Sequence, residues 1–134
     1  MHNNNNKIKI ATILPYKENY TFERAAAASL WVADFFKGSR FKKTNFIYGS
    51  TDKKDYLSKN YINIFIKNKN SKFTSSTKEY CDYFIKKVKN KKFDIIEVHN
   101  RPQVFTYLEK LLNSKYIIYF HNDPLSMGGS KTTR

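Results

Sequence analysis

Apolar residues follow two different spacings along the chain, and these spacings predict its strands and helices. Short apolar runs are typical of strands buried on both faces, whereas apolar positions three and four residues apart are typical of helices. Five segments have the first pattern, and we expect strands at residues 7–14, 45–48, 61–66, 93–98 and 116–120. Three have the second pattern, and we expect helices at residues 24–37, from about 75 to 90, and from 101 to about 112.

The residues at the ends of the three expected helices support these boundaries. Gly38 ends the first, the hydroxyls of residues 75–77 can cap the second, and Pro102 stands in the first turn of the third, a position that favours proline. The buried faces of the second and third helices are expected to consist of Tyr80, Cys81, Phe84, Ile85 and Val88, and of Val104, Tyr107, Leu108, Leu111 and Leu112.

The order of these elements predicts the fold class. Strands that alternate with helices and are continuously apolar indicate a parallel sheet covered on both faces. We therefore expect an α/β fold, a Rossmann-like open parallel sheet of about five strands with helices on both faces. Residues 1–6 read as a disordered polar leader and residues 7–134 as one domain. Residues 130–134 look like the start of a helix without its body, so we expect the domain to be incomplete at its C-terminus.

Composition restricts the class of protein. The chain has 134 residues, 40% hydrophobic and 16% aromatic, which are globular values. No apolar run has the ~20 residues that cross a bilayer, and the first residues are not a secretory signal. The single Cys81 excludes an internal disulfide and a cysteine zinc cage. We expect a cytoplasmic protein, with a peripheral place on the inner face of the membrane as the alternative.

The net charge of +14 raises the question of nucleic-acid binding. Of the 25 basic residues only four are Arg, the residue that makes bidentate phosphate and base contacts, and the Lys residues are spread along the chain. The interleaved Lys, Asn, Ile, Tyr and Phe residues are what an AT-rich coding sequence produces, so we favour mutational bias over nucleic-acid binding. In either case the surface should attract anionic membranes or negatively charged substrates.

Open parallel sheets bind ligands beyond the carboxyl ends of their strands, so polar residues there are candidate site residues. The loop after the first strand carries Glu18 and Asn19 and then Arg24, Ala25 and Ala26. Small residues would let a phosphate or sugar approach the helix N-terminus, although an alanine run is also simply a good helix start. Neither a dinucleotide-binding glycine motif nor a P-loop is present.

The end of the fourth strand carries a second group of polar residues. Glu97 lies within that strand and His99 at its end, so both side chains are expected on one face of the sheet. A lone histidine at a strand end is more often structural than functional. Asn100 and Arg101 beside His99 make a binding role about as well supported as a structural one.

The end of the fifth strand carries the third group. His121, Asn122 and Asp123 follow the strand directly, and amide and carboxylate groups there could bind sugar hydroxyls. The alternative is that the last two are turn residues. A metal site is not supported, because His99 and His121 have no third ligand, and no serine nucleophile elbow is present.

Residues 13–20, 96–102 and 119–132 together resemble the N-terminal domain of family 4 glycosyltransferases of the GT-B fold. The resemblance implies two Rossmann-like domains, the first binding mainly the acceptor and the second mainly the nucleotide sugar. It implies transfer with retention of configuration, to a glycan or lipid-linked acceptor of the cell envelope, without a metal or further cofactor. By the same resemblance residues 18–27 face the donor phosphates and the acceptor, His121 is the catalytic residue near the reacting sugar, and His99 borders the acceptor pocket.

The sequence departs from the family pattern in two ways. Residues 24–27 replace the usual pair of glycines, which narrows the space for a ligand. The second domain, with its paired glutamates, is missing from this chain. We therefore expect no appreciable transferase activity from the chain alone. Two other functions stay open: a stand-alone α/β binding or interaction module without catalysis, and a basic nucleic-acid-binding domain.

Overall fold

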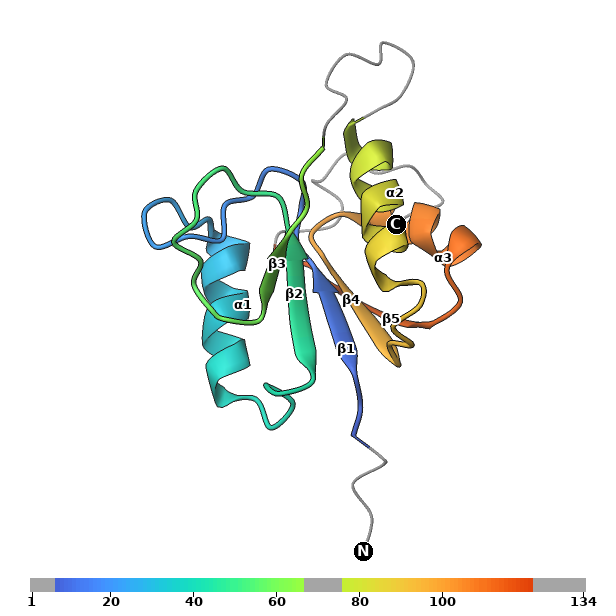
Figure 1. Ribbon diagram of the computed structural model, residues 1–134, viewed down its shortest axis with the longest axis horizontal. Coiled ribbons are helices and arrows are strands. Elements are labelled where there is room, and N and C mark those ends of the chain that lie inside the picture. Colours follow the sequence, from blue (N-terminus) through green and yellow to red (C-terminus); the bar gives the residue numbers. More distant parts are fainter. Residues whose placement is uncertain (1–6, 67–75, 122–134) are drawn as a thin grey trace, which may run out of the picture.

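The computed structural model describes residues 7–66 and 76–121 (Figure 1). Its eight elements are β1 (Ile10–Ile13), α1 (Ala27–Gly38), β2 (Asn45–Gly49), β3 (Tyr61–Asn63), α2 (Ser76–Val88), β4 (Ile95–His99), α3 (Pro102–Leu111) and β5 (Lys115–Tyr119). Each expected strand and helix is present, in the expected order. The helix start expected in residues 130–134 lies outside the described residues, as does the leader in residues 1–6.

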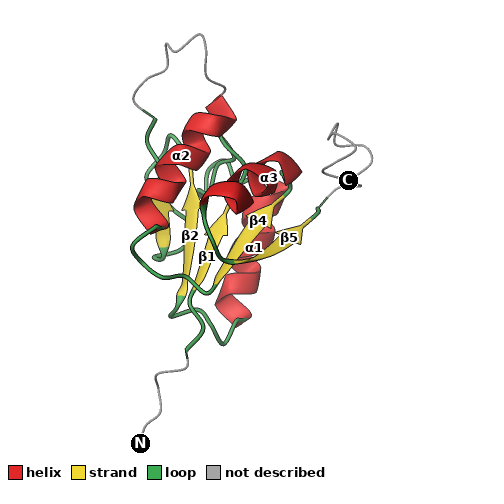
Figure 2. Ribbon diagram, turned by 90° about the vertical axis from the view of Figure 1, so that its right-hand side faces the viewer, coloured by secondary structure: helices red, strands yellow, loops and turns green. Residues whose placement is uncertain are grey.

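The five strands form one parallel sheet in the order β3-β2-β1-β4-β5. The chain starts in the middle with β1, moves outward to β3, and then returns to the other side for β4 and β5. The direction of winding therefore reverses between β1 and β4, and this is the place where sheets of this kind bind ligands. Helix α1 lies on one face of the sheet, and α2 and α3 lie on the other (Figures 1 and 2).

Two apolar cores lie between the sheet and its helices. The core under α2 and α3 consists of Ala11, Ile13, Tyr48, Ile64, Tyr80, Cys81, Phe84, Val88, Ile96, Val98, Val104 and Leu108. The core under α1 consists of Leu14, Tyr20, Val32, Ala33, Ile47 and Tyr61. Because helices cover both faces of an all-parallel open sheet, the expected Rossmann-like α/β fold is confirmed.

Two local expectations are wrong. Helix α1 begins at Ala27 rather than at residue 24, because Ala26 has an extended backbone (φ −82°, ψ 169°) and Arg24 belongs to a turn in which its N–H donates to the Thr21 hydroxyl. Leu111 is 58% exposed rather than part of the buried face of α3. The helix ends at that residue, and the chain turns there toward the edge strand β5.

The edge strand β5 leaves part of the α1 side of the sheet open. Ile117 of β5 is 40% exposed, and Trp31 of α1 is 39% exposed, its ring stacked on Phe35. Strand β5 spans Lys115–Tyr119 rather than the expected residues 116–120, and its first residue, Lys115, is exposed. Apolar residues such as Ile117 are thus partly exposed on the α1 side of β5, whereas a strand covered on both faces would bury them.

Gly49 at the end of β2 is expected to tolerate no side chain. A Cβ atom there would lie 2.7 Å from the hydroxyl of Tyr61, whose ring is buried and stacked on Tyr20. We expect Gly49→Ala to lower the free energy of unfolding by about 1–3 kcal/mol, measured by urea denaturation. The control is Gly38→Ala, where nothing lies within 4 Å of the added Cβ and the change should stay within about 0.5 kcal/mol or stabilise. Equal effects of the two substitutions would contradict this packing.

Candidate functional site

Two histidines meet at the carboxyl edge of the sheet. His99 is the last residue of β4, and His121 follows the end of the neighbouring strand β5. The Nδ1 atom of His99 lies 2.9 Å from the Nε2 atom of His121, and the two rings are stacked with their centroids 5.2 Å apart. We call these two residues the histidine pair.

Asn100 holds the ends of β4 and β5 together beside the histidine pair. Its backbone N–H donates to the Tyr119 carbonyl at 2.8 Å, and its side-chain oxygen accepts the backbone N–H of His121 at 2.9 Å. Asn100 has a φ of 58°, a left-handed conformation that asparagine tolerates better than most residues. The Arg101 guanidinium then donates to the Asn100 carbonyl at 2.8 Å. This turn fixes the position of the His121 backbone.

Aromatic rings enclose the histidine pair on the α1 side of the sheet. The Tyr119 ring is stacked on His99 at 4.8 Å, and the indole of Trp31 from α1 lies 5.2 Å from His121 and 5.7 Å from His99. His99 is only 1% exposed, whereas His121 is partly exposed at the edge. His99 therefore belongs to the support of the site, and His121 is the member that a ligand can reach.

A buried carboxyl group lies one position deeper on the same face. The Thr12 hydroxyl is 2.8 Å from the Glu97 carboxyl, and the Tyr119 hydroxyl also forms a hydrogen bond with it. Burial raises the pKa of Glu97, while these hydrogen bonds oppose the shift. The shared face of Glu97 and His99 is confirmed, because both contact Tyr119.

Burial favours the neutral form of both histidines. It lowers the pKa of His99 to about 3, with a further contribution from the neighbouring His121, and it lowers the pKa of His121 in the same direction. The contact between two neutral rings contains one hydrogen, which either Nδ1 of His99 or Nε2 of His121 carries. The other nitrogen of His99, Nε2, is buried and has no hydrogen-bond partner among the described residues.

The unpartnered nitrogen decides between these two arrangements. If His99 accepted the hydrogen bond, its Nε2 would carry a buried N–H without an acceptor, which proteins almost always avoid. We therefore infer that His99 donates through Nδ1–H and that Nε2 of His121 accepts. The hydrogen of neutral His121 is then on its Nδ1, which makes this atom a hydrogen-bond donor for a ligand.

Ring ¹⁵N chemical shifts should reveal this arrangement. We expect His99 to be a neutral Nδ1–H tautomer whose shifts stay unchanged down to about pH 4, because its pKa lies near 3. His121 should also be an Nδ1–H tautomer at neutral pH. A protonated His99 at pH 6, or an Nε2–H tautomer, would contradict the inferred hydrogen bond.

Glu18 from the loop after β1 lies at the N-terminus of α1. Its carboxylate accepts hydrogen bonds from the hydroxyl of Ser29, at 3.2 Å, and from the Ser29 backbone N–H in the first turn of the helix. Burial raises the pKa of Glu18, whereas these hydrogen bonds and the charge of Arg101 act against the shift. A phosphate that approached this helix N-terminus would have to displace the carboxylate.

The other expected site residues are dispersed. Asn19 accepts a hydrogen bond from the Thr51 hydroxyl at 2.8 Å, which ties the first loop to the segment after β2. No hydrogen bond or ring contact joins Asn19, Arg24, Ala25 or Ala26 to the histidine pair in the part of the chain that the structure describes. Asn122 and Asp123 lie outside the described residues. Among the expected residues, the structure thus brings together His99, Asn100, Arg101 and His121, and Glu18 lies close enough to Arg101 for their charges to interact.

Trp31 and Tyr119 are the members of the site that sequence reasoning missed. An aromatic residue in an amphipathic helix or an apolar strand gives no signal of a site, because burial in a core explains it equally well. Only the neighbouring positions of β4 and β5, and the placement of α1 over them, show that these rings enclose the histidine pair.

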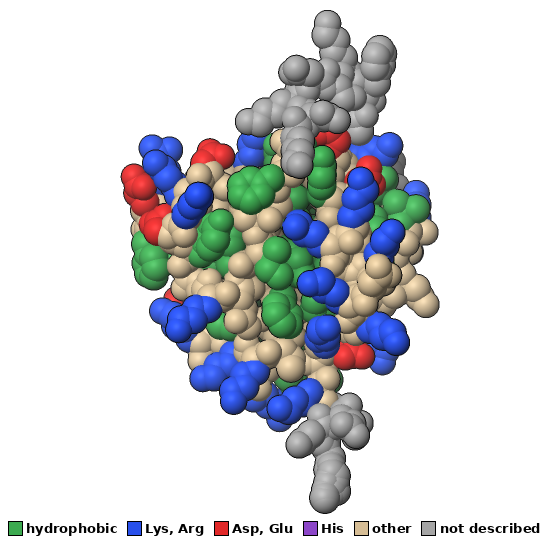
Figure 3. Space-filling model, viewed as in Figure 1, with side chains coloured by type: hydrophobic (Ala, Val, Ile, Leu, Met, Phe, Trp, Pro, Cys, Tyr) green, Lys and Arg blue, Asp and Glu red, His purple; other side chains and the backbone are tan. Residues whose placement is uncertain are grey.

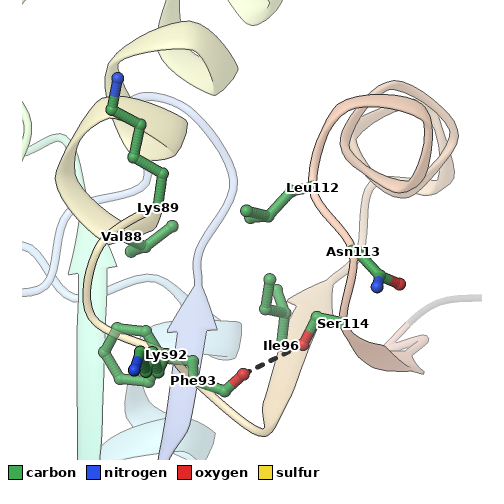
Figure 4. A pocket seen from close by; sticks show the side chains of 8 residues that line it. All are labelled: Val88, Lys89, Lys92, Phe93, Ile96, Leu112, Asn113 and Ser114. Atoms are coloured by element: carbon green, nitrogen blue, oxygen red, sulfur yellow. Dashed lines mark hydrogen bonds between the residues drawn. The ribbon is translucent and has the colours of Figure 1, made fainter.

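Two of the cavities that described residues line are found on the α2 and α3 side of the sheet. One of about 60 Å³ lies near the amino ends of β4 and β5, between residues that include Val88, Phe93, Ile96 and Leu112 (Figure 4). It is too small for a substrate. The other, of about 450 Å³, lies between the first turns of α2 and α3 and includes Arg101 in its wall. Within residues 7–66 and 76–121, no group of three or more His, Cys, Asp or Glu side chains could hold a metal ion.

Basic residues are spread along the sequence and over the face of the molecule that Figure 3 shows. On the face shown in Figure 3, Lys and Arg side chains are scattered around exposed apolar ones rather than gathered in one continuous patch. No helix in the described part of the chain is long and apolar enough to span a bilayer.

The fold and the histidine pair define this chain as a Rossmann-like α/β domain with a polar cluster at the carboxyl edge of its sheet. Comparisons with known protein families, curated proteins and solved structures gave no match. Its function therefore has to be argued from the site.

Proposed function

We propose that this chain is the acceptor-side part of a retaining glycosyltransferase with a GT-B arrangement, and that the histidine pair contacts the sugar at the transfer site. The observation that carries the proposal is the 2.9 Å contact between His99 and His121 at the carboxyl edge, next to the position where the winding of the sheet reverses. The resemblance of three strand-end segments to family 4 glycosyltransferases supports it by analogy.

The chemistry of the pair fits a hydrogen-bond donor better than a general base. Nε2 of His121 already accepts from His99, so it could take a proton from an acceptor hydroxyl only by losing that bond. Its Nδ1–H remains available to donate to a sugar hydroxyl or to an oxygen on which negative charge develops. The partly exposed indole of Trp31 beside it offers an apolar surface to a sugar ring.

Catalysis would need a second domain that binds the nucleotide. The described residues contain no dinucleotide motif at the first loop, and Glu18 occupies the N-terminus of α1. We therefore expect this chain to bind sugars weakly and to release no nucleotide from nucleotide sugars at a normal turnover. Nucleotide release at that rate by the isolated chain would contradict the expectation that catalysis needs a second, nucleotide-binding domain.

Two substitutions of His121 separate its two nitrogens. The amide of His121→Asn can replace Nδ1–H as a donor, whereas His121→Gln can replace Nε2 as the acceptor for His99. We expect His121→Asn to keep part of the sugar binding and His121→Gln to lose about tenfold or more, measured as NMR chemical-shift changes during titration with UDP-glucose. His2→Asn, outside the described residues, is the matched control. The reverse order of the two variants would contradict a donor role for Nδ1.

The alternative of nucleic-acid binding rests on the charge of +14. It predicts tight binding to unrelated duplexes that weakens steeply as salt is added. Because the basic residues are mostly Lys and are widely spread, we expect only weak binding that lacks sequence preference. Fluorescence anisotropy with two unrelated duplexes at low salt tests this, and submicromolar binding to both would favour the alternative.

A further inference from the structure

The larger cavity has a wall of cationic and hydrogen-bonding side chains. It has a volume of about 450 Å³ and lies between the first turns of α2 and α3. Its lining residues are Thr77, Lys78, Cys81, Arg101, Gln103 and Tyr107. Small-molecule sites commonly measure about 300–1,000 Å³, so the cavity is large enough for a ligand of the size of a monosaccharide derivative.

The charges around this cavity favour an anion. Lys78 and Arg101 contribute positive charge, and none of its described lining residues is acidic. Two carboxylates lie near the lining residues: Asp82 accepts the hydroxyl hydrogen of Tyr107 at 2.7 Å, and Glu18 is close enough to Arg101 for their charges to interact. Burial raises the pKa of the Cys81 thiol to about 12, so this residue adds no negative charge. The described lining of the cavity therefore carries two cations and no carboxylate.

The geometry of the two helices adds to this preference. Thr77 and Gln103 are the second residues of α2 and α3, so the N-termini of two helices of 13 and 10 residues face the same space. Helix N-termini carry partial positive charge and free backbone N–H groups. The threonine hydroxyl and the glutamine amide are neutral donors that suit a tetrahedral anion with several oxygens.

Arg101 joins the cavity to the edge of the sheet. It follows Asn100, and one of its guanidinium nitrogens donates to the Asn100 carbonyl, which leaves further N–H groups for a ligand. The planar guanidinium matches phosphate oxygens better than a lysine does. A ligand bound to Arg101 would thus lie next to Asn100, the residue whose side chain positions His121.

We propose that this cavity binds the phosphate group of a phosphorylated sugar, and that this sugar is the acceptor class of the site. The assignment of the ligand as an acceptor rests on the proposed function, whereas phosphate binding does not. A phosphate alone would leave much of the 450 Å³ unfilled, so the remaining volume and the neighbouring Tyr107 ring are available to the sugar. Because Arg101 lies in the cavity wall, we expect the phosphate end of the ligand to bind there.

Glucose 6-phosphate, inorganic phosphate and glucose are the probes for an NMR titration of the intact chain. We expect glucose 6-phosphate to shift the backbone amides of Thr77 and Gln103 and to bind about tenfold or more tightly than inorganic phosphate, with glucose having no effect there. Equal affinity for glucose 6-phosphate and inorganic phosphate would overturn the sugar part of the proposal. Absence of any shift at these amides would overturn the site.

Charge-matched variants distinguish a specific site from general attraction to a basic protein. Lys78→Gln and Arg101→Gln should each weaken glucose 6-phosphate binding about tenfold or more, whereas Lys87→Gln, in the last turn of the same α2, should leave it unchanged. Equal weakening by all three would overturn the proposal. If glucose 6-phosphate binds here while no sugar perturbs the histidine pair, the transferase proposal fails and the phosphate site stands.

Discussion

Replacing His99 with Phe should make the domain far less sensitive to acid. The folded chain holds His99 neutral with a pKa of about 3, whereas the unfolded chain binds a proton near pH 6.5. Below that value protons therefore favour the unfolded chain, and stability falls until the pH reaches about 3. Between about pH 6.5 and 4 this proton linkage amounts to about 3 kcal/mol of unfolding free energy. Phe cannot titrate, and it keeps an aromatic ring against Tyr119 and Trp31.

Urea denaturation of wild type and His99→Phe near pH 7 and near pH 4 measures this effect. Glu18 and Glu97 have raised pKa values and act in the opposite direction, because the folded chain binds their protons more readily, but both residues are present in both proteins. We expect the loss of stability between the two pH values to be about 3 kcal/mol larger in wild type. His2→Phe should behave like wild type. Identical losses in wild type and His99→Phe would mean that His99 is not the buried neutral group.

Truncating Tyr80 to Ala should remove a large part of the stability of the domain. The Tyr80 side chain is fully buried in the core under α2, and its hydroxyl donates to the Leu14 carbonyl at 2.7 Å. Loss of so large a side chain costs about 3–5 kcal/mol, comparable with the whole stability of many small domains. Tyr80→Phe keeps the ring and loses the hydrogen bond, so it should cost about 1–2 kcal/mol.

The position of this hydrogen bond connects the core to the site. Leu14 and Pro15 lead from β1 into the loop that carries Glu18.

The matched control for the Tyr80 variants is Tyr83→Phe, also on α2, where the ring is only partly buried. It should cost less than about 0.5 kcal/mol in urea denaturation. A cost for Tyr80→Ala no larger than for Tyr80→Phe would contradict the packing of this core.

The sequence pattern was sufficient to predict the fold, because the strands are apolar runs and the helices are amphipathic. It could not place the start of α1, since residues 24–26 are as favourable for a helix as Ala27. The first loop also makes tertiary contacts with the start of α1, among them the hydrogen bonds between Glu18 and Ser29, and local propensity does not contain them. The exposure of Leu111 likewise depends on where the sheet ends, which local periodicity does not contain.

The candidate site was predictable in outline only. The pattern places His99 and His121 at the carboxyl edge of a parallel sheet, but it does not say that β4 and β5 are neighbours or that the rings touch. The contact depends on the left-handed turn at Asn100, and its enclosure depends on Trp31, which lies about 70 positions from His99 in sequence. These relations are tertiary, so a single sequence does not display them.

We propose that the histidine pair is the sugar-binding part of a transfer site. An NMR titration of the isotope-labelled chain with a panel of nucleotide sugars and simple saccharides tests it most directly. We predict that at least one member shifts the Trp31 indole N–H together with the Asn100 amide and the His121 ring, and that the first two shifts are lost in His121→Gln but kept in His2→Asn. A panel that leaves all three wild-type signals unchanged, or that shifts the Trp31 and Asn100 signals equally in wild type and His121→Gln, would contradict this role.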